Sequence, residues 1–167
     1  MPIFTSPIVP QVLMMPGSES AQTTAATTAG AAFLSAVILR APATVTQMRT
    51  GFSGTPTGSV DMGVYDASGT NGAPNNLLGH TGAIAAATGL FTQNMTANLL
   101  LAPGRYWLAL LDTVADSVFT RAGALTALFP VMRTSATNLT VLPSTIGTVA
   151  NNGLIICYMA LLLNSWA

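Results

Sequence analysis

The chain has 167 residues, of which half are hydrophobic and only 6% are charged. Its five arginines balance five acidic residues, and it contains no lysine. This sparse, balanced charge gives no basic stripe for nucleic acid and no cationic face for lipid head groups, so neither is expected as a partner. Because ordinary soluble domains carry about 25% charged residues, we expect other chains to cover much of this surface.

The apolar segments do not predict a membrane protein. The apolar run 153–163 is well short of the ~20 residues that a spanning helix needs. The first residues contain prolines and lack the positive start of a signal peptide, so synthesis in the cytosol is expected. Cys157 is the single cysteine, which excludes an intrachain disulfide and predicts a buried thiol.

Residues 1–20 mix prolines with large apolar side chains, which predicts an extended N-terminal arm and disfavours a helix. Disordered tails are normally polar, so an apolar arm is expected to pack on a neighbouring subunit or on another protein. The candidate partner-binding residues of the arm are Pro2, Ile3, Phe4, Pro7, Ile8, Val9, Pro10, Leu13 and Met14.

Residues 21–32 are rich in alanine and threonine, and their composition leaves open a connector, a first strand or a short helix. Residues 33–167 are predicted to form one all-β domain. Apolar alternation and Gly, Pro or Asn turns every 8 to 12 residues or so are typical of a β-sandwich. The predicted strands are 33–39, 44–52, 60–65, 76–84, 89–101, 104–113, 127–133, 137–142 and 154–164, with 112–127 assigned to a short helix or a loop.

Strand 60–65 shows the clearest alternation. Its even-numbered residues, Val60, Met62 and Val64, share one face, and its odd-numbered residues, which include Asp61 and Tyr65, share the other. This period of two predicts a strand that is buried on one face only.

Two segments resemble a known class of domain. Val-Tyr-Asp-Ala-Ser-Gly-Thr-Asn-Gly-Ala-Pro-Asn-Asn-Leu-Leu (64–78) is followed by Leu-Ala-Pro-Gly-Arg-Tyr-Trp-Leu (101–108). This pattern resembles the jelly-roll β-sandwich domains of tailed-phage virion proteins and of bacterial extracellular proteins. The resemblance implies a capsid decoration (cement) protein on the virion surface that forms a homotrimer and binds the major capsid protein. It implies neither an enzyme nor a cofactor.

The chemistry-bearing residues are few. His80 is the single histidine, so it cannot form a two-histidine metal site, and no Ser-His-Asp spacing accompanies it. Asp61 and Asp66 would lie on opposite faces of one strand, which disfavours a glycosidase pair. The segment after Asp66 resembles the start of a calcium loop but lacks the later acidic ligand, so the alternative is an Asx turn. The glycines of 51–58 lack the lysine of a phosphate-binding loop.

Aromatic side chains leave one alternative function open. Tyr65, Trp107 and Trp166 are candidates for an oligomer interface or for a sugar-stacking platform, as in a carbohydrate-binding module of a fibre or surface protein. Tyr106 and Trp107 are adjacent, so one is expected in the core and the other on the surface. A hydrolase is the third alternative and has the least support.

Overall fold

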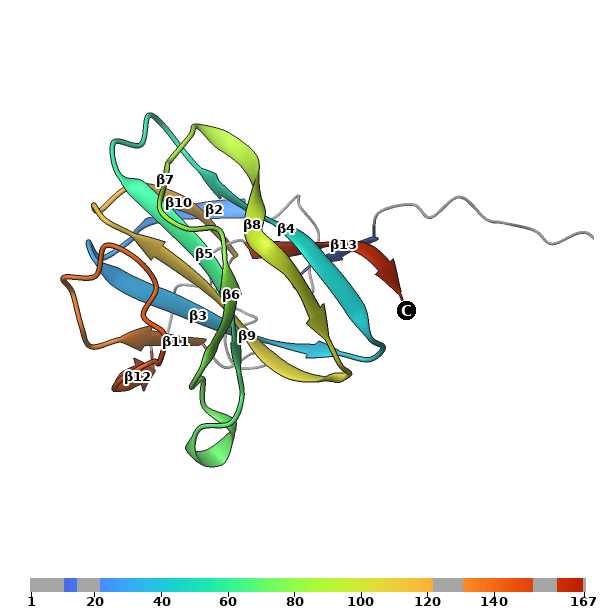
Figure 1. Cartoon of the computed structure of the whole chain (residues 1–167). Helices are drawn as coiled ribbons and strands as arrows, with labels where there is room; N and C mark the ends of the chain where they lie inside the picture. The colour runs from blue at the N-terminus through green and yellow to red at the C-terminus, as the bar shows by residue number, and fades with distance from the viewer. Residues whose placement is uncertain (1–10, 15–21, 122–130, 152–158, 167) are drawn as a thin grey trace, which may run out of the picture.

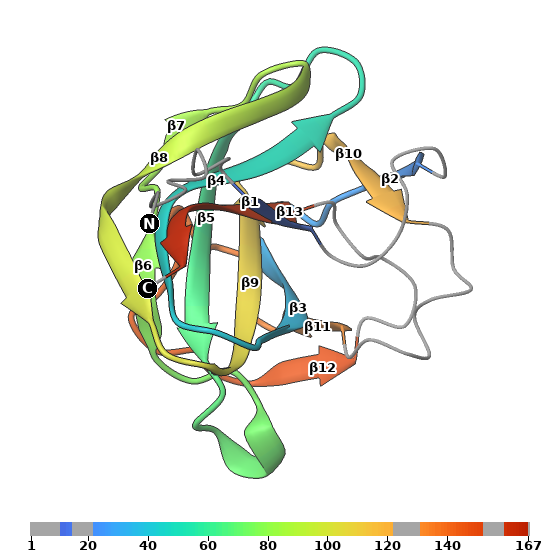
Figure 2. The same ribbon diagram turned by 90° about the vertical axis from the view of Figure 1, so that its right-hand side faces the viewer.

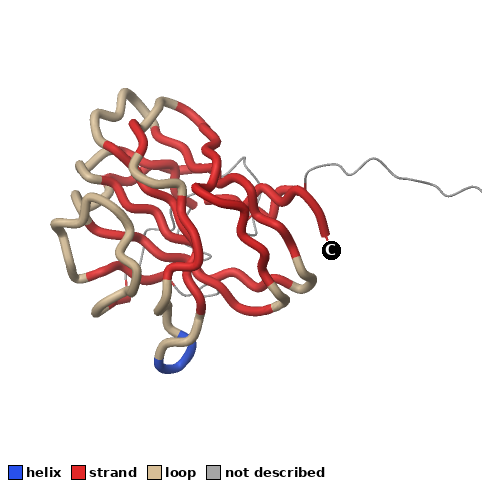
Figure 3. Tube along the Cα trace, viewed as in Figure 1, coloured by secondary structure: helices blue, strands red, loops and turns tan. Residues whose placement is uncertain are grey.

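The computed structural model describes residues 11–14, 22–121, 131–151 and 159–166. Within these ranges the chain forms thirteen β-strands and one short 3-10 turn at Thr70–Gly72. Figure 3 shows how strand dominates the trace, with the turn as the single blue segment. The strands form two antiparallel sheets that pack face to face, which confirms the predicted all-β sandwich. No helix of the described chain is long and apolar enough to cross a membrane.

The first sheet, sheet A, has six strands in the order β1-β13-β4-β10-β2, and β8 also pairs with β4. All of its pairings are antiparallel. Its strands are β1 (Gln11–Met14), β2 (Gln22–Ala26), β4 (Ala43–Phe52), β8 (Gly89–Leu101), β10 (Ser117–Arg121) and β13 (Met159–Trp166).

The second sheet, sheet B, has seven strands in the order β12-β11-β3-β9-β5-β6, and β7 pairs with β5. It too is antiparallel throughout. Its strands are β3 (Ala31–Leu39), β5 (Ser59–Asp66), β6 (Leu77–His80), β7 (Ile84–Ala85), β9 (Gly104–Asp112), β11 (Val131–Thr134) and β12 (Val149–Asn151).

Two corners join the sheets at the same end of the sandwich. The chain passes from β3 to β4 through Pro42, and from β8 to β9 through Pro103. The corners lie together, at the lower right of Figure 1, because β3 pairs with β9 and β4 pairs with β8. Proline suits such positions because its fixed φ turns the chain and it has no N–H to leave unpaired.

The main core lies between the sheets. Alternate residues of β3, β4, β5, β9 and β13 point inward, as the period of a strand requires. The largest of them, including Phe33, Phe52, Met48 and Met62, have no more than 1% of their surface exposed. The ring of Phe52 also stacks on that of Phe91, with centroids 6.0 Å apart.

A second core lies on the outer face of sheet B. Residues 135–148, here called the covering loop, run across this face between β11 and β12. Leu142 and Ile146 of the loop pack with Trp107, Tyr65 and neighbouring apolar residues of the sheet. The prediction that β5 is buried on one face only is therefore wrong, because the interior of β5 is buried on both faces.

Glycines allow the covering loop to approach the sheet closely. A Cβ on Gly63 would lie 2.6 Å from a methyl group of Leu142, so the missing side chain provides the space for that leucine. Gly30 has a φ of +66°, and a Cβ there would lie 2.3 Å from the Thr137 carbonyl oxygen. Its own carbonyl accepts the N–H of Leu139 at 3.0 Å. Glycine supplies both the positive φ and the close contact.

An irregularity in β8 closes one side of the sandwich. Gln47 pairs with Asn94, whereas Val45 pairs with Leu99, so β8 inserts extra residues at this point. Thr96 in the insertion donates a hydrogen bond from Oγ1 to the carbonyl oxygen of His80 on β6, at 2.9 Å. The bulge therefore ties an edge of sheet A to the edge of sheet B, which leaves less edge exposed.

Several predicted strands are observed and others are not. Strands 33–39, 44–52, 60–65, 89–101 and 104–113 correspond to β3, β4, β5, β8 and β9. The predicted strand 137–142 is part of the covering loop, and 76–84 is divided between β6 and β7. The segment 112–127, predicted as a short helix or a loop, contains the strand β10 among its described residues. Residues 22–26 of the alanine- and threonine-rich segment form β2, which is the strand alternative for that segment.

Part of the predicted N-terminal arm is a β-strand. Gln11–Met14 forms β1, which pairs antiparallel with Ala160–Leu163 of β13. The backbone of Leu13 and Met14 is thus an edge of the chain's own sheet, because β13 offers unpaired N–H and C=O groups on that side. Residues 1–10, with the other predicted arm residues, lie outside the described residues.

Candidate functional site

A polar cluster surrounds the buried carboxylate of Asp61. The residue has no exposed surface. Its Oδ2 lies 2.8 Å from Nδ1 of His80 and accepts the backbone N–H of Leu142 at 2.9 Å. The Thr81 hydroxyl lies 3.4 Å from Oδ1 and accepts the N–H of Met62 at 3.0 Å.

Strand register brings this cluster together. Gly63 of β5 pairs with His80 of β6, so the imidazole lies diagonally across the pair from Asp61 on the same outer face. The Thr96 bond fixes the backbone of His80 from the other side. The side chain of His80 is 30% exposed, whereas that of Asp61 is fully enclosed by Leu142 and its neighbours.

The chemistry of the cluster suits a structural role, which is to join separate segments of the chain. One carboxylate oxygen joins β5, the end of β6 and the covering loop. The carboxylate is hydrogen-bonded to a backbone N–H and to an imidazole nitrogen. These bonds hold it in place, because charge-assisted hydrogen bonds are roughly twice as strong as neutral ones. The hydrogen bonds of the described residues join no serine or threonine hydroxyl to the ring of His80.

Asp112, the last residue of β9, forms a second buried acidic site, opposite Val60 at the start of β5. Its Oδ2 lies 2.7 Å from the Thr27 hydroxyl and accepts the N–H of Asp116 at 3.3 Å. Burial raises the pKa of Asp112, and the nearby charge of Asp116 adds to this, while hydrogen bonds from Thr27 and Val114 oppose it. The site ties β2 and β9 to the turn that follows β9.

Asp66 organises the turn after β5. Its carboxylate accepts hydrogen bonds from the backbone and side chain of both Ser68 and Asn76, at 2.8 to 3.3 Å. Partial burial raises the pKa of Asp66, but the hydrogen bonds from Asn76 and Ser68 outweigh it and lower the pKa overall. This is the Asx-turn alternative of the sequence analysis, since the chain's own donors occupy the carboxylate oxygens.

Two of the three aromatic candidates are buried. Tyr65 and Trp107 have no exposed surface. The Tyr65 hydroxyl donates to the Pro143 carbonyl at 2.7 Å, and Nε1 of Trp107 donates to that of Gly72 at 3.0 Å. Their assignment to sugar stacking or to an oligomer interface is therefore wrong, because the covering loop and the 3-10 turn enclose both rings.

The remaining aromatic predictions have different outcomes. Tyr106 is partly buried against the main core, and Trp107 is fully buried on the opposite face of β9. The prediction that one of the two rings lies on the surface is therefore wrong. Trp166 ends β13, where its backbone is in register with Ala43, and its side chain lies outside the described part of the structure. Cys157 also lies outside the described residues.

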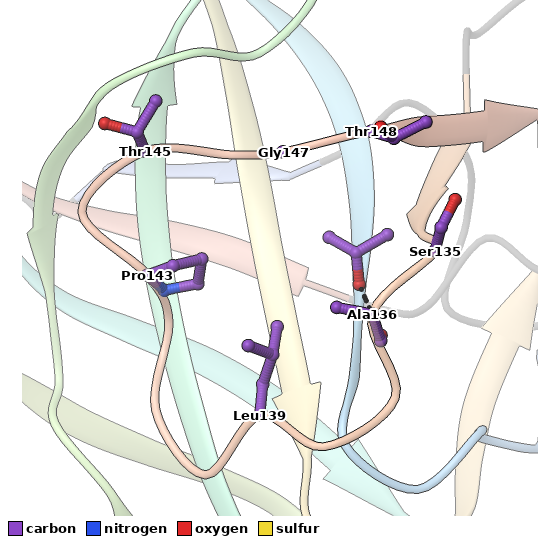
Figure 4. Close-up of a pocket in the computed structure, with 8 residues that line it drawn as sticks. Ser135, Ala136, Leu139, Pro143, Thr145, Gly147 and Thr148 are labelled. Atoms are coloured by element: carbon purple, nitrogen blue, oxygen red, sulfur yellow. Dashed lines mark hydrogen bonds between the residues drawn. The ribbon is translucent and has the colours of Figure 1, made fainter.

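A pocket of about 320 Å³ lies within the covering loop (Figure 4). Its volume is at the lower end of the range for small-molecule sites. One of its hydroxyls, that of Thr134, is already bonded to the N–H of Ala32 and the carbonyl of Ala136. No aromatic or charged side chain is among the residues that line it, which are Thr134, Ser135, Ala136, Leu139, Pro143, Thr145, Gly147 and Thr148.

Large apolar side chains remain on the surface. Leu100 is 71% exposed and Ile38 is 69% exposed, and both lie at the end of the sandwich that holds the two corners. Three more are scattered elsewhere, at Leu78, Leu90 and Val141. Within the described residues, no group of three or more His, Cys, Asp or Glu side chains is placed to hold a metal ion.

Comparison with known proteins assigns the chain to no family. No protein-family model matches the chain, and no curated protein sequence matches it.

The Asp61–His80 pair was missed by sequence reasoning. The two residues are 19 positions apart, whereas Asp66, the carboxylate close to Asp61 in sequence, faces the other side of the strand. A signal was available, since hairpin strands on either side of the 66–76 turn place residues near Gly63 and His80 opposite one another. The covering loop, which completes the site, gives no comparable signal because it contains no regular strand.

Proposed function

We propose that this chain is a structural protein of a tailed-phage virion, and specifically a decoration protein that binds the major capsid protein on the capsid surface. We further propose that it acts as a homo-oligomer, and specifically as the homotrimer that the resemblance to decoration proteins implies. Its work would be mechanical: binding the assembled lattice better than the free subunits stabilises the shell by mass action.

The observation that carries this proposal is how the chain uses its few charged groups. The carboxylates of Asp61, Asp66, Asp112 and Asp116 all accept hydrogen bonds from the chain's own backbone. They hold loops on the two sheets, while Ile38 and Leu100 stay largely exposed. Polar groups that stabilise the scaffold, together with the low charge of the chain, fit a protein that functions by contact, since the cores of protein interfaces are depleted in charged residues.

The resemblance of 64–78 and 101–108 to virion sandwich domains supports the phage context. The apolar residues of 1–10 support a partner-binding segment, since an extended apolar segment gains ~25 cal/mol for each Å² of apolar surface that it buries. Repetition of one contact by several subunits turns modest affinity into avidity. No observation favours the carbohydrate-binding alternative, because two of its three rings are enclosed.

The first experiment measures assembly and capsid binding together. Light scattering during size-exclusion chromatography gives the oligomeric state, and co-sedimentation with undecorated capsids of the encoding phage gives occupancy. We expect a stable oligomer that sediments with capsids. A monomer that stays in the supernatant would contradict the proposal.

The second experiment separates the arm from the fold. Deletion of residues 1–10 retains β1, so we expect unchanged unfolding and reduced capsid occupancy. Deletion of residues 1–16 is the matched comparison: it also removes β1 and exposes the edge of β13, so it is expected to lower stability as well. Full occupancy after deletion of 1–10 would contradict an arm that binds the capsid.

A further inference from the structure

We propose that Asn71, at the tip of the turn between β5 and β6, is a modification site. Its side-chain amide is lost by spontaneous deamidation, at a rate that the hydrogen bond between Trp107 and Gly72 limits. The reaction needs no partner protein and is independent of the proposed function. Figure 2 shows the turn in green, projecting from one end of the sandwich.

The sequence of the turn favours this reaction. Asn71 is exposed and is followed by Gly72. Deamidation begins when the backbone nitrogen of the next residue attacks the side-chain carbonyl carbon, and glycine hinders this attack least because it has no Cβ. Among the asparagines that the structure describes, Asn71 is the one followed by glycine, and the second Asn-Gly of the chain, at 152–153, lies outside the described residues.

The reaction needs only water as its second reactant. The Gly72 N–H loses its proton to the solvent, and the nitrogen forms a bond to Cγ of Asn71. The Cγ–Nδ2 bond breaks, and the amide nitrogen takes up a proton and leaves as ammonia. Water then opens the five-membered succinimide ring at one of its two carbonyl groups, which yields aspartate or isoaspartate.

The folded turn opposes closure of this ring. Asn71 has φ 57° and ψ 27°, the left-handed conformation in which asparagine is enriched. At this ψ, the Gly72 nitrogen and the Asn71 Cβ lie nearly opposite each other about the Cα–C bond, whereas ring closure needs them on the same side. This bond must therefore rotate before the nitrogen can reach Cγ.

Hydrogen bonds hold the turn against that rotation. The N–H of Gly72 donates to the Gly69 carbonyl at 3.0 Å, and the N–H of Ala73 donates to the Thr70 carbonyl at 3.2 Å. Nε1 of Trp107 donates to the Gly72 carbonyl at 3.0 Å, and this bond ties the tip of the turn to strand β9, where the indole is fully buried. Ring closure therefore requires local opening of the turn, and its rate follows the fraction of molecules in which the turn is open.

The products differ from the parent turn in charge and in backbone length. Either product adds a negative charge one residue before Gly72. That glycine lies beside Arg105, since Nη1 of Arg105 would be 3.2 Å from a Cβ on Gly72. Isoaspartate also inserts a methylene group into the main chain before Gly72, so the bonds of Gly72 to Gly69 and to Trp107 cannot both keep their geometry.

The test is peptide mapping by mass spectrometry of protein kept in mildly alkaline buffer, where the backbone nitrogen loses its proton more readily. The peptide that contains residue 71 reports the conversion of amide to acid, and chromatography separates its aspartyl and isoaspartyl forms. We expect slow conversion in the folded wild type, and conversion at least about tenfold faster when urea unfolds the chain, because the hydrogen bonds of the turn no longer limit the reaction. Asn71→Gln should abolish the change in this peptide, since glutamine would have to close a six-membered ring.

Two matched variants test the role of Trp107. Trp107→Phe keeps an aromatic ring and removes the bond to Gly72, so it should convert about twofold to tenfold faster than the wild type, the range expected for loss of one hydrogen bond. Tyr65→Phe is the control, because it removes one hydrogen bond, to Pro143, from the same outer core and leaves the turn unchanged. It should convert at the wild-type rate, and urea unfolding shows which variants are folded in the buffer used.

Each outcome decides the proposal. Faster conversion in Trp107→Phe alone supports it. Equal acceleration in Trp107→Phe and Tyr65→Phe would show that general loss of core stability sets the rate, and would overturn control by the Trp107 bond. Folded wild type that converts as fast as the chain in urea would overturn protection by the turn, a comparison that needs no variant. Absence of conversion at residue 71 in the folded wild type and in both variants would overturn the site itself.

Discussion

The imidazole of His80 lies 2.8 Å from the carboxylate of Asp61, the group that also bonds the covering loop to sheet B. The same carboxylate oxygen accepts the N–H of Leu142, the loop residue that fills the space above Gly63. One buried charge therefore couples the edge strand β6 to a loop that has no strand of its own across this face. The outer core exists because these polar contacts position the loop.

Removal of the Asp61 carboxylate is expected to be the most damaging of the single polar changes. Asp61→Ala leaves the Leu142 N–H and the His80 ring without their acceptor inside the fold, and should lower the free energy of unfolding by about 3 kcal/mol. His80→Ala should cost less, because the ring is partly exposed and water can replace it. Urea unfolding measures both. Equal losses in the two variants would mean that the carboxylate does not organise the loop.

Tyr65 is expected to make the protein sensitive to high pH. Burial, with a smaller contribution from the charge of Asp61, raises the pKa of the Tyr65 phenol above its ordinary value of 10.0. Above pH 10 the unfolded chain therefore releases this proton while the folded chain retains it, so stability falls as pH rises.

The matched variant for that effect is Tyr65→Phe. Loss of the bond to Pro143 should lower stability by about 1 kcal/mol at neutral pH. The variant should then lose less stability than the wild type between pH 9 and pH 11 in denaturant unfolding. An identical decline in both proteins would show that the phenol ionises freely in the folded state.

Much of the sandwich could be predicted because its strands carry their own signals. Gly89–Leu101 was predicted with the bounds that the structure shows, since glycine and proline mark both ends. Val149–Asn151 and Ser117–Arg121 were missed because short edge strands depend on their neighbours for pairing, and little in three to five residues indicates a strand.

The outer core could not be predicted because it depends on a loop. Strand 60–65 alternates Asp61, Gly63 and Tyr65 with apolar residues, which is the pattern of a strand with one polar face. The covering loop satisfies Asp61 and the Tyr65 hydroxyl by hydrogen bonds from a distant segment, so the polar face is buried after all. A strand with one polar face is exposed on that face unless a distant segment covers it and bonds to its polar groups.

Asp112 and Asp66 are expected to give opposite pH dependences. The pKa of Asp112 is raised from 3.8, so the folded chain holds its proton more tightly than the unfolded chain does. Its contribution to stability is present at low pH and is lost as pH rises from about 4 through the raised pKa. The pKa of Asp66 is lowered, so its contribution is present above about 4 and is lost on acidification.

The measurement compares Asp112→Asn and Asp66→Asn with the wild type by urea unfolding from pH 2.5 to pH 7. Relative to Asp112→Asn, the wild type should lose stability as pH rises through the acidic range. Relative to Asp66→Asn, it should gain stability over the start of the same range. Slopes of the same sign for both comparisons would contradict the assigned environments.

Ser35 offers a stabilising change. Its hydroxyl is buried between the sheets, with 1% of the residue exposed and no hydrogen-bond partner among the residues that the structure describes. A buried hydroxyl without a partner loses its bonds to water and gains nothing in return, so Ser35→Ala should raise the free energy of unfolding by about 1 kcal/mol. Thr27→Val is the matched contrast, because the Thr27 hydroxyl lies 2.7 Å from Asp112 Oδ2, and its loss should destabilise by about 2 kcal/mol. Denaturant unfolding at pH 7 measures both changes, and a Ser35→Ala variant less stable than the wild type would show that the hydroxyl is bonded in the folded protein.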